Sequence, residues 1–185
     1  MNDFQINFGI EELIKSTVKA VDMEIEIRKD NSGINMSYNF IGNYIGVDMN
    51  RLLIAKSEMP ALISLELYVK ILTIHELGHA IDRNALMSTL DRTIEIYNIK
   101  QTHTLKELYN DVNLLEILLE EHEMNLSFEQ TAWSNAEKLN QIYNIVEPMY
   151  FEKVKKHSLS TYTDSYQADQ SLYNLLIEET SEQIA

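Results

Sequence analysis

Two histidines and a glutamate within five residues are the part of this chain best suited to chemistry. His75, Glu76 and His79 occur in the segment His-Glu-Leu-Gly-His. On a helix, residues four apart lie one above the other on the same face, so the two imidazoles can converge on one metal ion. Glu76 projects about a quarter-turn away, where its carboxylate can reach a water on the metal without being a ligand. This arrangement favours general-base activation of that water.

The surroundings of these residues strengthen the pattern, which by itself also occurs by chance. The motif comes late in a long apolar stretch, and small or apolar residues, Ala80 and Ile81, follow it. Two surface histidines with a solvated glutamate between them fit this apolar context poorly. Gly78 lies inside the motif and costs a helix about 1 kcal/mol relative to alanine. It therefore predicts the close approach of a neighbouring element.

A catalytic zinc needs a third protein ligand and one position for water. The chain from Thr104 to Tyr143 predicts a long helical region with apolar residues at steps of three and four. Eight acidic residues lie from Glu107 to Glu137, and Glu129 is the one on the apolar stripe. A carboxylate in a core must be paired or bound to metal, which makes Glu129 the candidate. Glu123 replaces it if the helix breaks near Asn125 or Ser127 and the register shifts.

Two further polar residues share a face with these candidates. Asp82 could be a ligand, an acceptor that orients a histidine ring, or a helix-end residue that pairs with Arg83 or Arg92, and the last two interpretations are favoured. His122 lies seven residues before Glu129. It could stabilise an oxyanion or orient a ligand, although a histidine hydrogen-bonded within the core is the simpler interpretation.

The elements that position these residues predict an α+β fold: a small, twisted, mostly antiparallel sheet packed on a central motif helix, followed by a mainly helical C-terminal part. We expect a single domain over residues 1–185, with a helix and the sheet in 1–58, the motif helix region in 59–100, and the helical part with the third ligand in 104–185. The expected elements are a helix at 9–21, strands at 23–27, 34–41 and 44–49, a short strand or irregular segment at 51–55, the motif helix from about 60 to 82, and two helices after Pro148 around a polar linker at 158–170.

Composition limits the partners. The chain has 29 acidic and 15 basic residues and a formal charge of -14, which argues against nucleic acid as a ligand. It has no cysteine, so a zinc ion must be held by histidine and carboxylate. The N-terminus lacks a basic leader with an apolar core, and the longest apolar stretch is interrupted by Glu66 and Lys70. We therefore expect a cytoplasmic protein without a membrane segment.

The motif resembles that of the zincin metallopeptidases, and more narrowly of the gluzincin-like group, in which a second helix contributes a glutamate. Glu129-Gln130-Thr131-Ala132-Trp133 is similar to the Glu-x-x-Ala element of small ImmA/IrrE-like peptidases. The segment from His75 to Asp82 is also similar to the catalytic region of lethal factor-like proteases. The resemblance covers residues 20–140 in outline, and the spacing from His79 to Glu129 is longer than in the tightest family members.

The resemblance implies roles for individual residues. His75, His79 and Glu129 would bind Zn²⁺, and Glu76 would be general base and then proton donor. An edge strand of the sheet would pair with an extended peptide substrate. The oxyanion needs a further group, and the sequence does not choose among the candidates in the C-terminal third: Tyr143, Tyr150, His157, Tyr162 and Tyr166.

These observations predict a zinc-dependent metallopeptidase that acts on a peptide or protein substrate. Two alternatives remain open. The first is a non-catalytic, metal-stabilised protein that regulates or binds a partner through its acidic helix face. The second is a hydrolase that acts on a small amide. Glu76 beside both histidines favours catalysis, because a purely structural zinc does not need that carboxylate.

Overall fold

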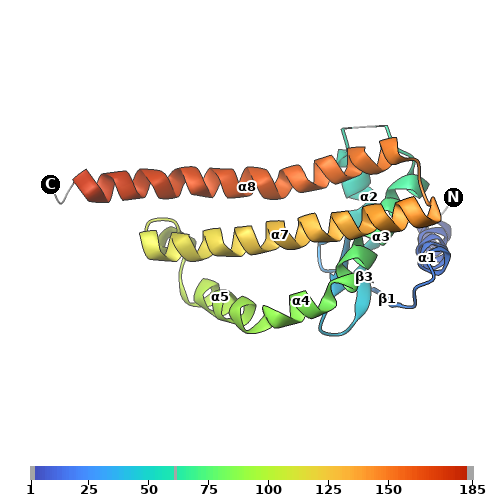
Figure 1. The fold of residues 1–185 in the computed structure, drawn as a ribbon, viewed down its shortest axis with the longest axis horizontal. Coiled ribbons are helices and arrows are strands. Elements are labelled where there is room, and N and C mark those ends of the chain that lie inside the picture. The colour runs from blue at the N-terminus through green and yellow to red at the C-terminus, as the bar shows by residue number, and fades with distance from the viewer. Residues whose placement is uncertain (1–2, 61, 183–185) are drawn as a thin grey trace. The chain divides into compact units, whose positions relative to one another are not determined.

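Helices make up most of the structure, and three short strands form one small sheet (Figure 1). The computed structural model describes residues 3–60 and 62–182. Within these ranges, no helix combines the length and the apolar character needed to cross a bilayer. The elements are α1 (Asp3–Ala20), β1 (Glu26–Lys29), β2 (Met36–Asn39), β3 (Tyr44–Val47), α2 (Met49–Glu58), α3 (Leu65–Ile81), α4 (Arg83–Ser88), α5 (Leu90–Thr102), α6 (Leu105–Leu108), α7 (Val112–Tyr143) and α8 (Pro148–Glu182).

The chain folds into two compact units. The first combines Met1–Asn84 with Gln130–His157, and the second combines Ala85–Glu129 with Ser158–Ala185. Helices α7 and α8 each contribute to both units. The expectation of a single domain stays a prediction.

The sheet of the first unit has β3 at its centre. β3 pairs in parallel with β1 and antiparallel with β2, so the sheet is mixed. Met36 and Tyr38 alternate with more exposed residues along β2, and Ile45 and Val47 of β3 are fully buried. The predicted α+β class, with a small sheet beside the motif helix and a helical C-terminal part, is confirmed.

Helix α3, which carries the motif, is the central element of the first unit. It contacts α1, α2 and β2, and ten of its residues from Tyr68 to Gly78 are buried. The helix begins later than the predicted Pro60. Ser64 is its N-cap, and the Ser64 hydroxyl accepts a hydrogen bond from the Leu67 backbone N–H at 3.2 Å. This cap fixes the first turn, because it satisfies a donor that has no partner inside the helix.

The segment expected at 51–55 to be a short strand or irregular is instead part of helix α2. The Asp48 carboxylate caps this helix by accepting from the Arg51 N–H at 3.0 Å, and it also accepts from the Gly33 N–H at 3.0 Å. Met49, Leu52 and Ala55 are buried at intervals of three residues. This helical spacing is the signal that the sequence interpretation missed.

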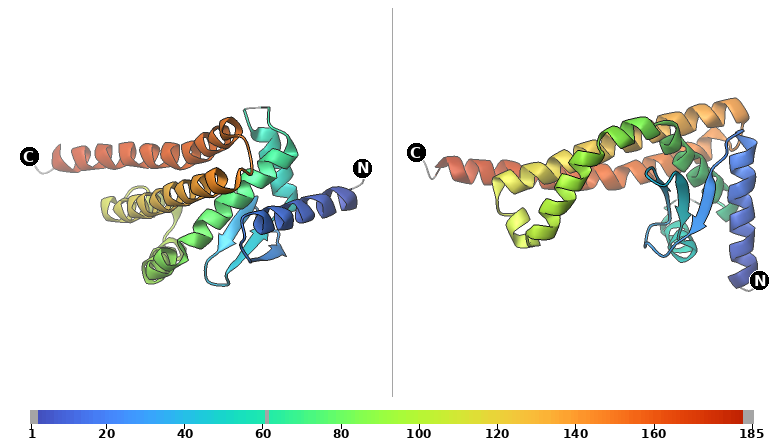
Figure 2. Two further views of the ribbon diagram at one scale, coloured as in Figure 1. Left: turned by 45° about the vertical axis from the view of Figure 1, so that its right-hand side comes forward. Right: turned by 90° about the horizontal axis from the view of Figure 1, so that it is seen from below.

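The predicted polar linker at 158–170 is also wrong, because α8 continues through it as one helix. In the second unit, α7 and α8 run side by side in opposite directions (Figure 2). The Tyr166 hydroxyl donates to Glu123 at 2.8 Å, and His122 pairs with Asp169 at 2.9 Å. The polar residues of this stretch adopt a helix because residues of α7 provide their hydrogen-bond partners.

The long helical region expected from Thr104 is interrupted. Thr104 and Glu107 form a capping box on α6, and α7 starts after Asp111. The Asp111 carboxylate accepts from the backbone N–H groups of Asn113 and Leu114. From Val112 to Tyr143 the helix is continuous.

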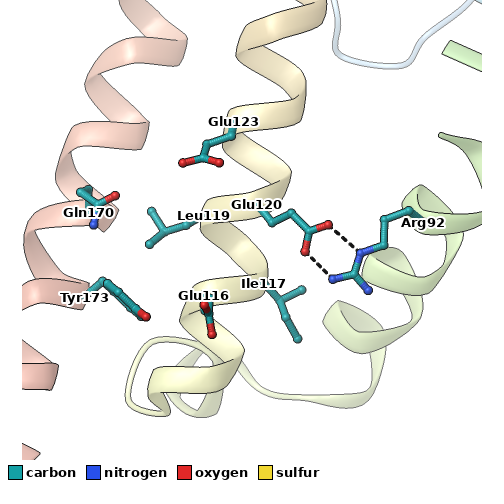
Figure 3. Close-up of a pocket in the computed structure, with 8 residues that line it drawn as sticks. All are labelled: Arg92, Glu116, Ile117, Leu119, Glu120, Glu123, Gln170 and Tyr173. Carbon is teal, nitrogen blue, oxygen red and sulfur yellow. Dashed lines mark hydrogen bonds and ion pairs between the residues drawn. The ribbon is translucent and has the colours of Figure 1, made fainter. Parts of the chain in front are cut away.

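The second unit has a small apolar cluster and a polar groove. Leu108, Leu115 and Leu118 are the buried members of the cluster, and Leu172 and Leu176 of α8 pack against them. The groove has a volume of about 510 Å³ and lies between α7, α8 and α5 (Figure 3). Its lining residues are Arg92, Glu116, Ile117, Leu119, Glu120, Glu123, Gln170 and Tyr173.

Candidate metal centre

Helix α3 presents the motif side chains from an unbroken run of helix. His75 and Glu76 are each 5% exposed, and His79 is half-buried. The two imidazole rings meet edge to face, with 4.8 Å between their centroids and 72° between their planes. This is the arrangement expected for histidines four residues apart on one helical face.

Glu129 joins the two histidines in a group that could hold a metal ion. Each of the three side chains offers one ligand atom, and these atoms all lie within 4.8 Å of one another. Glu129 is half-buried and directly precedes Gln130, where the first unit's segment of α7 begins. Helix α7 has no break near Asn125 or Ser127, and Glu129 rather than Glu123 belongs to this group.

A close contact between α3 and α7 fixes the backbone near this carboxylate. A Cβ atom built on Gly78 would lie 2.1 Å from the Ala132 carbonyl oxygen, a distance that no real side chain tolerates. The Asn135 side-chain amide donates to the Gly78 carbonyl at 3.2 Å. Gly78 therefore permits the close approach that its position in the motif predicted, and the contact lies three residues from Glu129.

The chain's single tryptophan packs on one of the candidate ligands. The indole of Trp133 is fully buried and stacks on the His75 ring, with centroids 4.1 Å apart and planes at 21°. Phe151 of α8 meets the same indole edge-on at 5.5 Å. The stack restricts rotation of the His75 ring, so Trp133 acts as a wall of the site as well as core.

The other two predicted site residues lie outside the group of three. Asp82 is the C-cap of α3, and its backbone N–H donates to the His79 and Ala80 carbonyls. Arg83, one of its expected partners, donates to the Phe40 and Ile41 carbonyls. The second expected partner, Arg92, pairs with Glu95 and Glu120.

His122 pairs through Nε2 with Asp169, which also accepts from the Tyr109 hydroxyl at 3.3 Å. Burial, followed by the nearby Asp169 charge, raises the pKa of Tyr109. The histidine thus belongs to a hydrogen-bonded network in the second unit. A role for His122 in catalysis stays a prediction.

Sequence reasoning missed the partner of Glu129. The Tyr162 hydroxyl of α8 donates to Glu129 Oε1 at 3.1 Å. The sequence placed Tyr162 only among five candidates to stabilise the oxyanion. The linker expected at 158–170 concealed the pairing of α7 with α8, and so the contact with Glu129. Once α8 is one helix, Tyr162, Tyr166 and Asp169 recur on a single face at helical spacing, which is the signal that could have found them.

The donor set fits a zinc ion. Zinc binds imidazole nitrogen and carboxylate oxygen at about 2.1 Å, and in a tetrahedral site these bonds separate the ligand atoms by about 3.4 Å. The three atoms here lie within 4.8 Å of one another, which is somewhat wider than this spacing. Two imidazoles and one carboxylate leave a fourth position for water or substrate.

Comparison with known proteins gives no family for this chain. No protein-family model, curated protein or solved structure matches it.

Proposed function

We propose that the protein is a zinc-dependent metallopeptidase. The observation that carries the proposal is the group formed by His75, His79 and Glu129, with ligand atoms within 4.8 Å of one another and Glu76 on the same helix as the histidines. A structural zinc needs four protein ligands, whereas this group supplies three. The proposal therefore combines an open metal position with a neighbouring base.

In this mechanism, each side chain has a separate task. His75, His79 and Glu129 hold the ion. Zinc, when bound, polarises the scissile carbonyl and lowers the pKa of the attacking water. The Glu76 carboxylate accepts the proton of that water and then delivers it to the leaving amine nitrogen. Burial of Glu76 to 5% exposure supports this role, because it keeps the carboxylate on the motif helix away from bulk water.

The sheet offers a place for the substrate. β2 is an edge strand, and it packs beside α3, the helix that carries Glu76. An extended peptide that added to this edge would form backbone hydrogen bonds and lie along the motif helix. A peptide or protein substrate is therefore proposed in preference to a small amide.

Zinc analysis and peptide cleavage test this function together. We expect the wild-type protein to bind one zinc ion and to cleave members of a peptide library. Glu76→Gln is expected to bind zinc equally well and to lose about 100-fold or more of the activity. Glu116→Gln is the matched control, because it removes the same charge from an exposed residue of α7.

Two results would contradict the proposal. Zinc-loaded wild type and Glu76→Gln that are equally inactive would identify a non-catalytic, metal-stabilised protein. A wild-type protein that binds no zinc would show that the proposed function, which depends on zinc, is wrong.

A further inference from the structure

A tyrosine on α8 contacts the carboxylate of the candidate third ligand. The Tyr162 hydroxyl donates to Glu129 Oε1 at 3.1 Å, and both side chains are half-buried. An ionised carboxylate only accepts hydrogen bonds, so the hydroxyl proton points at Glu129. The contact lies on the residue that would complete the metal site.

The backbone of α8 holds Tyr162 in place through neighbouring contacts. On the same face of α8, Tyr166 donates to Glu123 at 2.8 Å, and Asp169 pairs with His122 at 2.9 Å. The hydrogen bond to Glu123 raises the pKa of Tyr166, as expected for a phenol that donates to a charged carboxylate. Residue numbers rise along α7 as they fall along α8, which is the register of an antiparallel helix pair.

A carboxylate that serves as a third ligand must be held in one orientation. Glutamate has three side-chain torsions, so its carboxylate can adopt several orientations unless a partner holds it. A donor fixed on Oε1 limits rotation of the carboxylate group. Hydrogen-bonded partners of metal ligands act in this way in many sites.

We propose that Tyr162 is the positioning residue for Glu129, and that its hydroxyl presets the carboxylate for the metal ion. This inference rests on the proposed function, because it assumes that His75, His79 and Glu129 bind the ion. It adds that α8, far along the chain from the motif, determines the affinity of the site. Tyr162 does not touch substrate in this proposal and acts only through Glu129.

Tyr166 provides a matched control. Both tyrosines donate a hydroxyl from α8 to a glutamate of α7, and both are half-buried. Glu123, the partner of Tyr166, is exposed and does not belong to the metal group. Replacing either tyrosine with phenylalanine removes a hydrogen bond to a glutamate of α7, and Tyr166→Phe also removes a contact with Gln170 at 3.2 Å. Only the bond from Tyr162 reaches a candidate ligand.

The experiment measures metal affinity without using activity. Wild type, Tyr162→Phe and Tyr166→Phe are titrated with Zn²⁺ against a chromophoric chelator, and their metal-free melting temperatures are compared. We expect Tyr162→Phe to weaken zinc binding by about tenfold or more, and Tyr166→Phe to bind as wild type does. Both variants should melt at similar temperatures without metal. In the Co²⁺-loaded protein, the visible spectrum should change for Tyr162→Phe alone, because the carboxylate is free to bind through both oxygens.

The outcomes separate the inference from the function on which it rests. Wild type that binds no metal would contradict the proposed function itself. Wild type and Tyr162→Phe that bind zinc equally tightly, with equal Co²⁺ spectra, would overturn the positioning role alone. Equal losses of affinity in Tyr162→Phe and Tyr166→Phe would also overturn it, because the effect would then belong to the helix pair as a whole.

Discussion

Two consecutive stretches of α7 are built differently. Residues 120–129 form a polar stretch, in which no side chain is fully buried. Its residues pair with polar side chains of other helices, among them Arg92, Tyr162 and Asp169. Residues 130–140 form an apolar stretch, in which five of the eleven residues are buried and Trp133 and Ala136 are fully enclosed. One stretch is held by directional contacts between half-exposed groups, and the other by close apolar packing.

If Glu129 binds metal as proposed, this difference lets one helix both anchor a ligand and orient it. Close packing at Ala132 and Trp133 fixes the backbone, since apolar interiors have little free volume. Glu129 is the last residue before this stretch of the same helix, so the packing at Ala132 and Trp133 also fixes the position of its backbone. In the proposal, the orientation of its carboxylate depends instead on the hydrogen bond from Tyr162 of α8, and a single hydrogen bond contributes less to stability than close apolar packing does.

The largest effect is expected in the apolar stretch. Trp133→Ala removes the indole between His75 and Phe151 and should lower the free energy of unfolding by about 3–5 kcal/mol. Trp133→Phe keeps an aromatic ring in the stack and should lose less. Urea denaturation of the metal-free protein measures both. A loss in Trp133→Ala no greater than that of a surface substitution would show that this stretch does not anchor α7.

Gly78→Ala tests the helix contact directly. The added methyl group would meet the Ala132 carbonyl, so we expect a loss of about 1–3 kcal/mol in spite of the better helix propensity of alanine. Gly9→Ala on α1 is the control, because a Cβ there has nothing within 4 Å. It should stabilise the protein by up to about 1 kcal/mol. Equal effects of the two substitutions in thermal denaturation would contradict the close approach.

A smaller effect is expected in the polar stretch. His122→Ala breaks the pair with Asp169, which keeps the Tyr109 hydroxyl as a donor. The expected loss is about 1 kcal/mol, since one hydrogen bond between partly exposed groups is removed. A loss as large as that of Trp133→Ala would remove the contrast between the two stretches.

The smallest effect is expected at the exposed pair of Arg92 and Glu120. Hydrogen bonds from Arg92 lower the pKa of Glu120 below its ordinary value. The pair therefore stabilises the folded state above the unfolded pKa, and this contribution is lost as the pH falls through the lower folded pKa. Because Glu120 is 48% exposed, solvent screening keeps the contribution of the pair small.

Arg92→Gln tests this pair by urea denaturation across the acidic range. The variant should lack the small decrease in the free energy of unfolding that wild type shows at acidic pH. Added salt should reduce the difference in free energy of unfolding between the two proteins. A difference that grew with salt would argue against an ion pair.

Local patterns predicted much of the fold. The motif helix, the helix before the sheet and the three strand regions follow from periodicity over short windows, and the structure contains each of them. Boundaries were less accurate because a single cap moves them, as Ser64 does for α3. The linker at 158–170 was wrong for a different reason: its polar residues are helical because of partners on α7, which no local window contains.

The sequence by itself determined the motif, since His75, Glu76 and His79 lie on one helical turn and local geometry places them. It also singled out Glu129, through a register that holds as long as the helix is continuous. Only the tertiary structure decided that Ala132 reaches Gly78, that Trp133 stacks on His75 and that Tyr162 reaches Glu129. Such contacts join residues far apart in the chain, and their distances depend on how helices pack rather than on any local preference.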